Sequence, residues 1–292
     1  MARRIIDVHN HPNWHGHTID RLVENMDQYG IEKTWLLSWE IPDDEYNVEP
    51  GYHEVMDPRG RGAEFWMIVE GLQKYPNRFI GGWAPDPRSR SARARLQAAV
   101  NLYGIKVYGE LKLRMRYDNP DAIAMYRFCG GLKLPVLFHL ELPRCAMDRL
   151  CEDHRQWPAW YGGDITVVGN MCRQCPETIF IGHGPGFWRE ISADAEADQS
   201  SYPSGPVQAH GRMTELLRRH PNLYADLSAG SGANSLERDL DHGRQFVLEF
   251  QDRILFGRDY FDRRQLDVLE KLDLPDPVMD KVLCQNALRL IG

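Results

Sequence analysis

The chain has 292 residues, of which 42% are hydrophobic, and this is enough to fill a sizeable core. Its 42 acidic residues outnumber its 35 basic ones, and the formal net charge of −7 argues against a nucleic-acid-binding protein. No apolar run reaches about 18 residues, so we expect no membrane span, and the start "MARRIIDVHN" lacks the apolar segment of a signal peptide. We therefore expect a cytoplasmic protein that binds neither nucleic acid nor membrane.

Short apolar runs recur along the chain, and polar segments rich in Gly or Pro follow them. They predict eight strands, at 3–11, 31–39, 78–86, 104–110, 134–141, 178–184, 222–230 and 253–260. Helical spacing of apolar residues appears between several of them, at 63–75, 91–103, 121–130, 211–220 and 238–250. In "KYPNRF" and "RHPNLY" a proline closes a helix just before the next strand begins.

This alternation of strands and helices predicts parallel strands joined by right-handed crossovers. Eight such units in 292 residues predict an α/β fold, a TIM-like (β/α)8 barrel, in a single domain covering residues 1–292. The rival is an open doubly wound sheet, but that fold normally has a glycine-rich turn after an early strand, and "DVHNHPNWHGH" is not one. The irregular stretches 40–60 and 184–206 are expected to stand over the mouth of the barrel.

Two histidines stand at the end of the first predicted strand. Alternate residues of a strand point to the same face, so His9 and His11 point the same way. If Ile5 and Asp7 share that face, the two histidines form the top of an inward-facing row. Two imidazoles at this spacing can chelate one divalent cation.

Polar side chains also end three later strands. His139 ends the fifth run, His183 the sixth and Asp259 the eighth. Burying an unpaired imidazole or carboxylate is costly, and the catalytic residues of a barrel lie at the C-terminal ends of its strands. We therefore expect these three side chains to meet His9 and His11 at the mouth of the barrel.

The ordered set of these motifs resembles the amidohydrolase superfamily, and within it the amidohydrolase-related family 2 of metal-dependent hydrolases. The matching stretches are "DVHNH" at the start, "HL" after the fifth strand, "GHG" after the sixth, "FGRDY" at the eighth and "NALRLIG" as a closing helix. The resemblance spans the whole chain. Arg258 departs from it, because members more often carry a small hydroxyl residue there, and "GIKVYGE" lacks a histidine that many members place shortly after the lysine.

The resemblance implies one divalent metal ion with His9, His11, His139 and Asp259 as its ligands. It also implies His183 beside the water that the metal activates, so His183 and Asp259 are the expected catalytic residues. Three imidazoles and a carboxylate suit Zn²⁺, with Mn²⁺, Fe²⁺ and Co²⁺ as alternatives.

Lys106 in the fourth predicted strand leaves a second arrangement open. Some superfamily members carboxylate such a lysine to bridge two metal ions, and His139 and His183 would then hold the second ion. Alternatively, the amine of Lys106 contacts a carboxylate of the substrate. We favour the arrangement with one metal ion.

Several further residues just past strand ends are candidate substrate contacts, namely Glu40, Glu110 and Trp188. A solvated loop acid or ordinary aromatic packing is the alternative for each. Glu141 lies two residues beyond His139, so its carboxylate could orient that imidazole.

The resemblance predicts a metal-dependent hydrolase that uses a metal-activated water to cleave a small amide, ester or lactone. The first alternative is a non-oxidative decarboxylase of an aromatic or unsaturated carboxylic acid. The second is a barrel that binds a ligand without turnover. The expected partner is a small-molecule substrate, and the sequence is compatible with a homo-oligomer.

Overall fold

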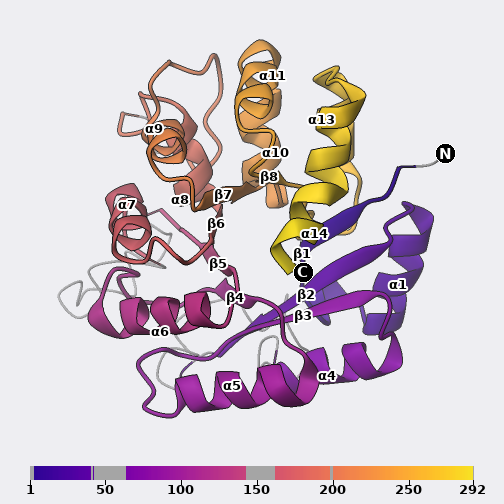
Figure 1. The fold of residues 1–292 in the computed structure, drawn as a ribbon. Helices are drawn as coiled ribbons and strands as arrows, with labels where there is room; N and C mark the ends of the chain where they lie inside the picture. The colour runs from indigo at the N-terminus through magenta and orange to yellow at the C-terminus, as the bar shows by residue number, and fades with distance from the viewer. Residues whose placement is uncertain (1–2, 41, 43–63, 143–161, 198–199, 292) are drawn as a thin grey trace.

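The computed structural model describes residues 3–40, 42, 64–142, 162–197 and 200–291. Within these residues eight strands form a central ring with helices around it (Figure 1). The strands are β1 (Ile6–Asn10), β2 (Lys33–Trp39), β3 (Phe79–Ala84), β4 (Tyr108–Leu111), β5 (Val136–His139), β6 (Phe180–His183), β7 (Leu223–Asp226) and β8 (Ile254–Leu255). Seven of them lie within the predicted runs, and β4 extends one residue past the run 104–110, to Leu111.

Helices alternate with these strands along the described part of the chain. They are α1 (Ile19–Gln28), α4 (Phe65–Lys74), α5 (Ala92–Tyr103), α6 (Pro120–Gly131), α7 (Ile165–Gln174), α8 (Pro185–Trp188), α9 (Arg212–Arg219), α10 (Ala229–Glu237), α11 (Leu240–Glu249), α12 (Arg264–Lys271), α13 (Asp276–Asp280) and α14 (Asn286–Ile291). The short 3₁₀ helices η1 (Trp14–Gly16) and η2 (Arg189–Ile191) and the π-helix η3 (Lys281–Gln285) complete the set in the described residues. Side-chain caps fix several starts, because Asn119 accepts from the amide of Ala122 before α6 and Asp164 accepts from Thr166 before α7.

The strands are parallel and close into a barrel. Strands β1, β2 and β3 pair in that order, and strands β4 to β8 pair in theirs. The amide of Trp83 donates to the carbonyl of Val107 at 3.1 Å and joins β3 to the chain just before β4. The amide of Val8 donates to the carbonyl of Phe256 at 2.9 Å and joins β1 to β8. The prediction of a TIM-like (β/α)8 barrel is confirmed.

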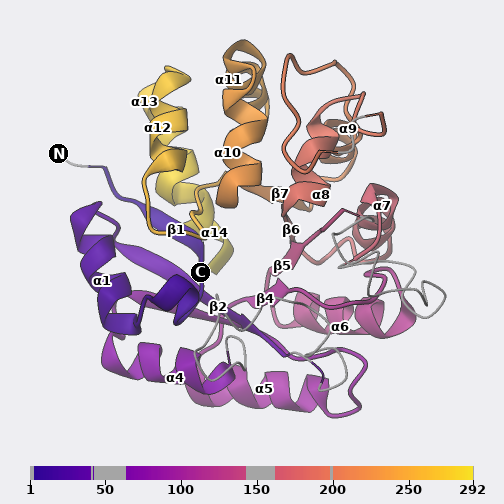
Figure 2. The same cartoon turned by 180° about the vertical axis from the view of Figure 1, so that it is seen from behind.

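Apolar side chains from seven of the strands, together with Val107 just before β4, fill the inside of the barrel. They are Ile6, Val8, Trp35, Leu37, Ile80, Val107, Leu137, Ile181, Tyr224 and Leu255. Helix α14 packs Ala287, Leu288 and Ile291 against this cluster, near the C-terminus of the chain (Figure 2). Helix α14 thus covers the inner cluster on the side away from the C-terminal ends of the strands.

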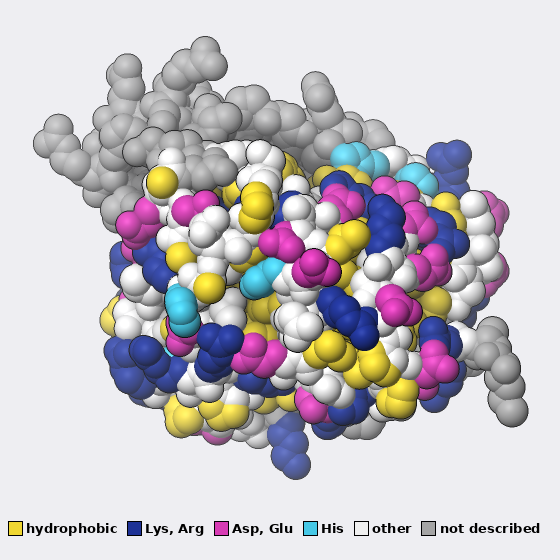
Figure 3. Space-filling view, turned by 90° about the horizontal axis from the view of Figure 1, so that it is seen from above, with side chains coloured by type: hydrophobic (Ala, Val, Ile, Leu, Met, Phe, Trp, Pro, Cys, Tyr) yellow, Lys and Arg dark blue, Asp and Glu magenta, His cyan; other side chains and the backbone are white. Residues whose placement is uncertain are grey.

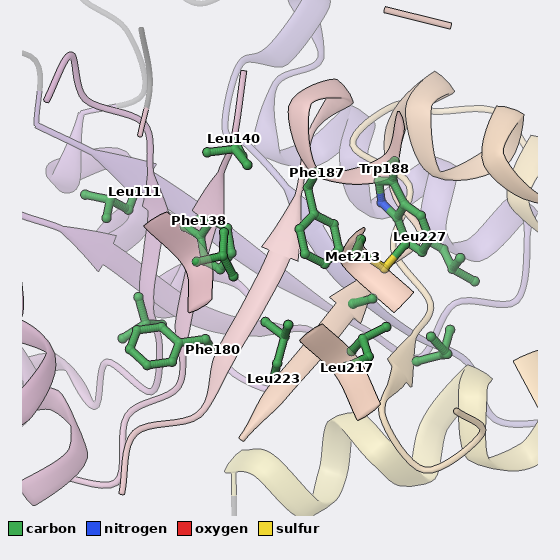
Figure 4. Packing of buried hydrophobic residues seen from close by; sticks show 14 of the residues in the cluster. Leu111, Phe138, Leu140, Phe180, Phe187, Trp188, Met213, Leu217, Leu223 and Leu227 are labelled. Carbon is green, nitrogen blue, oxygen red and sulfur yellow. The ribbon is translucent and has the colours of Figure 1, made fainter. Parts of the chain in front are cut away.

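A second apolar layer lies between the strands and the outer helices (Figure 4). Phe138 of β5 and Phe180 of β6 point outward into it, where they meet Phe187 and Trp188 of α8 and Leu217 of α9. Burial of one such side chain contributes about 1.5–3 kcal/mol to folding. Helix α8 and η2 also correct the expectation of an irregular stretch at 184–206.

The outer surface carries charges of both signs. On the face in Figure 3, Lys and Arg side chains alternate with Asp and Glu, and exposed ion pairs such as Arg218 with Glu249 join neighbouring helices. Among the described residues no helix is both long and apolar enough to span a bilayer. The predicted loop at 40–60 lies almost wholly outside the described residues.

Candidate metal centre

The five predicted side chains meet at the C-terminal ends of the strands. His9 lies in β1 and His11 directly follows it, His139 and His183 end β5 and β6, and Asp259 follows β8. All five are buried, and the most exposed of them, His139 and Asp259, are only 8% exposed. His139 and His183 are also register partners in the pairing of β5 with β6. The parallel register thus brings residues far apart in the sequence to one end of the barrel.

Strand β1 does not form the expected inward row. Ile6 and Val8 point into the barrel, whereas the carboxylate of Asp7 binds the guanidinium of Arg258 (Nε–Oδ2 2.8 Å). The register of β1 against β2 shifts between Asp7 and Asn10. This irregularity lets His9 reach the mouth of the barrel although Asp7 faces elsewhere. The condition that Asp7 shares the face of the histidines, on which the inward row depended, is therefore not met.

Three of the predicted ligands form a tight group. The Nε2 atoms of His9 and His11 lie 3.2 Å apart, and Oδ1 of Asp259 lies 3.8 Å from the first and 3.4 Å from the second. Ligand atoms about 2.1 Å from an ion at tetrahedral corners would lie about 3.4 Å apart. The group therefore has the spacing of three ligands of one divalent ion.

Glu110 stands among the histidines rather than at the rim. It is 1% exposed, and its Oε1 lies 3.1 Å from Nδ1 of His139 and 3.8 Å from Nε2 of His183. Its Oε2 lies 3.5 Å from Nε2 of His11. The sequence analysis assigned Glu110 only a substrate contact, and the structure places it as a further candidate ligand.

Each imidazole of the cluster turns its other nitrogen to a fixed partner. These contacts are His9 Nδ1 to Asp226 (2.7 Å), His11 Nδ1 to the carbonyl of Leu37 (2.9 Å), His139 Nε2 to Glu141 (3.2 Å) and His183 Nδ1 to Ser228 (2.8 Å). Acceptors at these positions hold a proton on the outward nitrogen and leave the inward lone pair for a metal ion. The contact with Glu141 agrees with the orienting role expected for it.

Asp226 and Ser228 are functional candidates that the sequence analysis missed. Asp226 is fully buried at the end of β7. The hydroxyl of Ser228 donates to Oδ2 of Asp226 at 2.7 Å, so its oxygen is free to accept from His183. A carboxylate that ends an apolar run, as in "NLYAD", was the available signal, because it is the pattern that identified Asp259.

Burial and the neighbouring charges shift the pKa values of the side chains in this cluster, often in opposite directions. Burial alone would lower the pKa of His9, but the carboxylates of Asp259 and Asp226 raise it to about 9. Burial also acts to raise the pKa of Glu110, whereas the hydrogen bond to His139 and the charge of His9 hold it well below its ordinary value. Burial and the nearby His9 lower the pKa of His183. The carboxylates thus favour positive charge at the centre of the cluster, which is the electrostatic requirement of a cation site.

Asp259 itself shows that the site fits a metal ion. Its Oδ1 is buried and has no hydrogen-bond partner among the described residues, which is costly for a carboxylate oxygen. Its backbone has a positive φ of 59°, an unusual conformation that clusters at functional sites. Imidazole nitrogens and carboxylate oxygens are the ligands that zinc and similar ions take.

A glycine allows the strands to approach closely beneath the site. A Cβ at Gly257 would lie 2.3 Å from Oδ1 of Asp226, 3.0 Å from Cβ of Ser228 and 3.2 Å from Cβ of His9. Only glycine fits there without moving the residues that hold His9 and His183 in place.

Three predicted substrate contacts do not join the cluster. Lys106 is exposed and lines a pocket of about 560 Å³ with Ile179 and Ile291 at the N-terminal end of the barrel. Glu40 accepts a bidentate ion pair from Arg95 (2.7 and 2.9 Å). Trp188 is buried in the outer apolar layer and donates its Nε1 to the carbonyl of Asp226 at 2.8 Å. A carboxylated Lys106 cannot bridge ions at the histidine cluster from where it lies.

Other side chains border the cluster. The ring centroid of Trp39 lies 5.1 Å from that of His11, and Nζ of Lys112 stands 5.5 Å from the centroid of Trp39. The charge of Lys112 acts on Glu110 and His139. Lys112 thus supplies a cation beside the centre, where the sequence analysis expected Lys106.

Solved structures show the same fold at low sequence identity. A TIM-barrel protein from Bordetella bronchiseptica has 17% identity and a TM-score of 0.65, with 98% of each chain covered. A dihydroxybenzoic acid decarboxylase from Polaromonas sp., with manganese and 2-nitroresorcinol bound, has 17% identity and a TM-score of 0.59, with 99% of this chain and 97% of that chain covered. A protein described as a probable 2-pyrone-4,6-dicarboxylic acid hydrolase, from Acinetobacter baumannii, has 13% identity and a TM-score of 0.58, with 99% of each chain covered.

A comparison with curated proteins found no match. A protein-family model for amidohydrolases matches residues 6–292, nearly the whole chain. The matched range contains every residue of the cluster described above. The family resemblance of the sequence motifs is confirmed, and the chain belongs to the amidohydrolase family.

Proposed function

We propose that the protein is a metal-dependent hydrolase of a small amide, ester or lactone. The observation that carries the proposal is the buried cluster of inward-facing imidazole nitrogens and carboxylate oxygens at the open end of the barrel. His9, His11 and Asp259 would hold the ion, with Glu110 beside them. A divalent ion there supplies Lewis acidity, which lowers the pKa of a water molecule and polarises a carbonyl group.

The residues of the chain supply the proton transfers. Asp259, whose Oδ2 lies 3.9 Å from Nε2 of His183, would help to hold the ion and would accept a proton from the attacking water. The water oxygen bonds to the carbonyl carbon, the bond from that carbon to the leaving nitrogen or oxygen breaks, and Asp259 returns the proton to the leaving atom. His183, held by Ser228, keeps a neutral imidazole beside this exchange.

We propose zinc as the ion, because imidazole is the majority ligand type in the cluster. Manganese is the alternative, since Glu110 and Asp259 add carboxylate oxygens, which suit Mn²⁺. The Polaromonas decarboxylase was solved with manganese.

Non-oxidative decarboxylation of an aromatic or unsaturated acid is the second candidate. Lys112 favours it, because an ammonium group near the cluster can bind a substrate carboxylate. Solved structures with the same fold include decarboxylases as well as hydrolases.

The test is a substrate panel with purified protein that has been stripped by a chelator and reloaded with Zn²⁺ or Mn²⁺. Lactones, esters and amides are followed in ¹⁸O-labelled water, and aromatic and unsaturated acids are followed by release of carbon dioxide. A hydrolase incorporates one ¹⁸O atom into the acid product and releases no carbon dioxide. Metal-dependent carbon dioxide release without ¹⁸O incorporation would establish the second candidate, and a reloaded protein inactive on both panels would contradict both.

A further inference from the structure

A pocket lies at the N-terminal end of the barrel, away from the candidate metal centre. Its volume is about 560 Å³, within the range of about 300–1,000 Å³ that small-molecule pockets occupy. Residues at the ends of α5, α6 and α14 line it, together with the turns that lead into β4, β5 and β6. One organic molecule of moderate size therefore fits between these elements.

The walls of this pocket are mostly apolar. They include Ile105, Leu132, Leu134, Ile179, Leu290 and Ile291. Three of these, Ile179, Leu290 and Ile291, pack against the apolar cluster inside the barrel but stay only partly buried. The pocket thus offers a ligand an apolar surface whose burial would favour binding.

The charges at the pocket are unbalanced. Three cations, Lys106, Lys133 and Arg289, line it with one acidic residue, Glu177, although the whole chain carries a net charge of −7. Within the described residues none of the three cations forms an ion pair, and Arg289 donates to a backbone carbonyl and to an amide oxygen, which are uncharged. A negatively charged group in the pocket would therefore meet cations that no described carboxylate neutralises.

The two lysines follow the C-terminal ends of α5 and α6, but these helix ends are capped without their ammonium groups. The amide of Gly104 donates to the carbonyl of Val100 at the end of α5, at 3.0 Å. The backbone amide of Lys133 donates to the carbonyl of Gly130 at the end of α6, also at 3.0 Å. Because backbone amides satisfy these carbonyls, the ammonium groups of Lys106 and Lys133 are available to a ligand.

Lys133 also has an unusual backbone conformation. Its φ is 56°, in the left-handed region that glycine or asparagine usually occupies after a helix. Another residue type in this region costs free energy, and such residues cluster at ligand sites and active sites. A lysine at a position that favours glycine supports a role for its side chain in the pocket.

We propose that this pocket binds a small amphipathic anion, an organic molecule with an apolar or aromatic body and one carboxylate, sulfonate or phosphate group. The body would lie against Ile179, Leu290 and Ile291, and the anionic group would face Lys106 and Lys133. An uncharged molecule with the same body should bind less tightly. The pocket and the candidate metal centre lie at opposite ends of the barrel, so the proposal does not depend on the function proposed above.

Two fluorescent probes that differ by one sulfonate group test the proposal. Anilinonaphthalenesulfonate carries an anionic group on an apolar ring system, and phenylnaphthylamine has the same rings without the sulfonate. The wild-type protein should bind the sulfonate at one saturable site, about tenfold more tightly than the uncharged probe. Metal-loaded and chelator-stripped protein should bind it equally. A titration without a saturable site, or sulfonate binding that the metal ion blocks, would overturn the proposal.

Variants of the lining residues locate the site. Lys106→Gln combined with Lys133→Gln should weaken binding of the sulfonate by about tenfold and leave the uncharged probe unaffected. Lys271→Gln, at an exposed lysine of α12 outside the pocket, is the matched control and should bind both probes as the wild type does. Leu132→Trp narrows the pocket and should weaken both probes.

Circular dichroism checks that each variant is folded. Unchanged affinity for the sulfonate in the folded double variant would contradict the role of the two lysines and overturn the proposal. Equal losses for both probes in that variant would show that charge does not select the ligand, which also overturns it. Unchanged binding of both probes by folded Leu132→Trp would place them outside the pocket.

Discussion

Two buried charged groups lie side by side where β1 and β8 meet, and they differ in how they are satisfied. Asp7 and Arg258 form a fully buried ion pair, while His9 and Asp259, two and one positions further along the same segments, belong to the candidate metal centre. Both oxygens of Asp7 accept hydrogen bonds, from Nε and the amide of Arg258 and from the amide of His9. Oδ1 of Asp259 accepts none from the described residues.

The difference separates a structural ion pair from a ligand site. The protein itself provides the countercharge for Asp7, and Arg258 also donates to Asn25 of α1 at 2.8 Å. For Asp259 the neighbouring groups are the imidazoles of His9 and His11, which can hold either a proton or a metal ion. Substitutions in the two groups should therefore affect different properties of the protein.

Removal of a metal-ligating side chain should have the largest effect, and this effect is on catalytic activity. His9→Ala or Asp259→Asn should lower kcat/KM by about 10³-fold or more, because the several kcal/mol of stabilisation that a metal ion contributes would be lost. Bound metal should fall in parallel, which mass spectrometry of the purified variants measures. Lys106→Ala is the control that should keep both metal and activity, and full activity in either ligand variant would contradict the site.

Loss of the ion pair between Asp7 and Arg258 should lower the stability of the protein rather than its activity. Arg258→Met leaves the carboxylate of Asp7 buried without its partner, so the free energy of unfolding should fall by about 3–5 kcal/mol in urea titrations. The double variant Asp7→Asn with Arg258→Met should recover part of this loss. In metal-free protein Asp259→Asn should cost less than Arg258→Met, because Oδ1 of Asp259 accepts no hydrogen bond from the described residues. Equal losses of unfolding free energy in Arg258→Met and Asp259→Asn would contradict the distinction between the ion pair and the candidate metal site.

Removal of a residue that only orients a ligand should have an intermediate effect. Asp226→Asn weakens the contact that directs the lone pair of His9 inward, so metal affinity should fall by about 10–100-fold. Competition with a chromophoric chelator measures this change. An unaltered dissociation constant would show that Asp226 does not set the tautomer of His9.

Metal affinity should depend on pH with a defined sign. The pKa of His9 is about 9 in the metal-free protein, and a metal ion binds only the neutral imidazole. Below pH 9 a proton must leave on binding, so affinity should rise by about tenfold per pH unit between pH 6 and 8 and level off near 9. Calorimetry in buffers of different ionisation enthalpy counts the released protons, and zero released at pH 7 would refute the coupling.

The smallest change in stability is expected from substitution of Glu40, which belongs neither to the buried ion pair nor to the candidate metal centre. Burial acts to raise its pKa, but the hydrogen bonds from Arg95 and from the amide of Asp86 lower it overall. The stabilisation from this pair is therefore present above the pKa of the unfolded chain and is lost as pH falls through the lower folded value. Because the pair is about one-third exposed, Glu40→Gln should cost only about 0.5 kcal/mol at pH 7 and leave metal binding unchanged.

The sequence predicted the barrel and most of the centre, because strand ends are marked by polar residues after apolar runs. The expectation failed at Lys106, which the resemblance to the superfamily had suggested as a metal bridge or a substrate contact in the fourth predicted strand. The strand begins at Tyr108, so Glu110 rather than Lys106 reaches the mouth. The sequence left the orientation of Asp7 open, because a shift in strand register leaves no mark in the pattern of residue types.

Anomalous diffraction from crystals of protein loaded with Zn²⁺, recorded on both sides of the zinc absorption edge, tests the central claim most directly. The account predicts anomalous density enclosed by His9, His11, Asp259 and Glu110 at the C-terminal end of the barrel. A saturated crystal with no anomalous density among these side chains, or with density only at the Lys106 pocket, would contradict it.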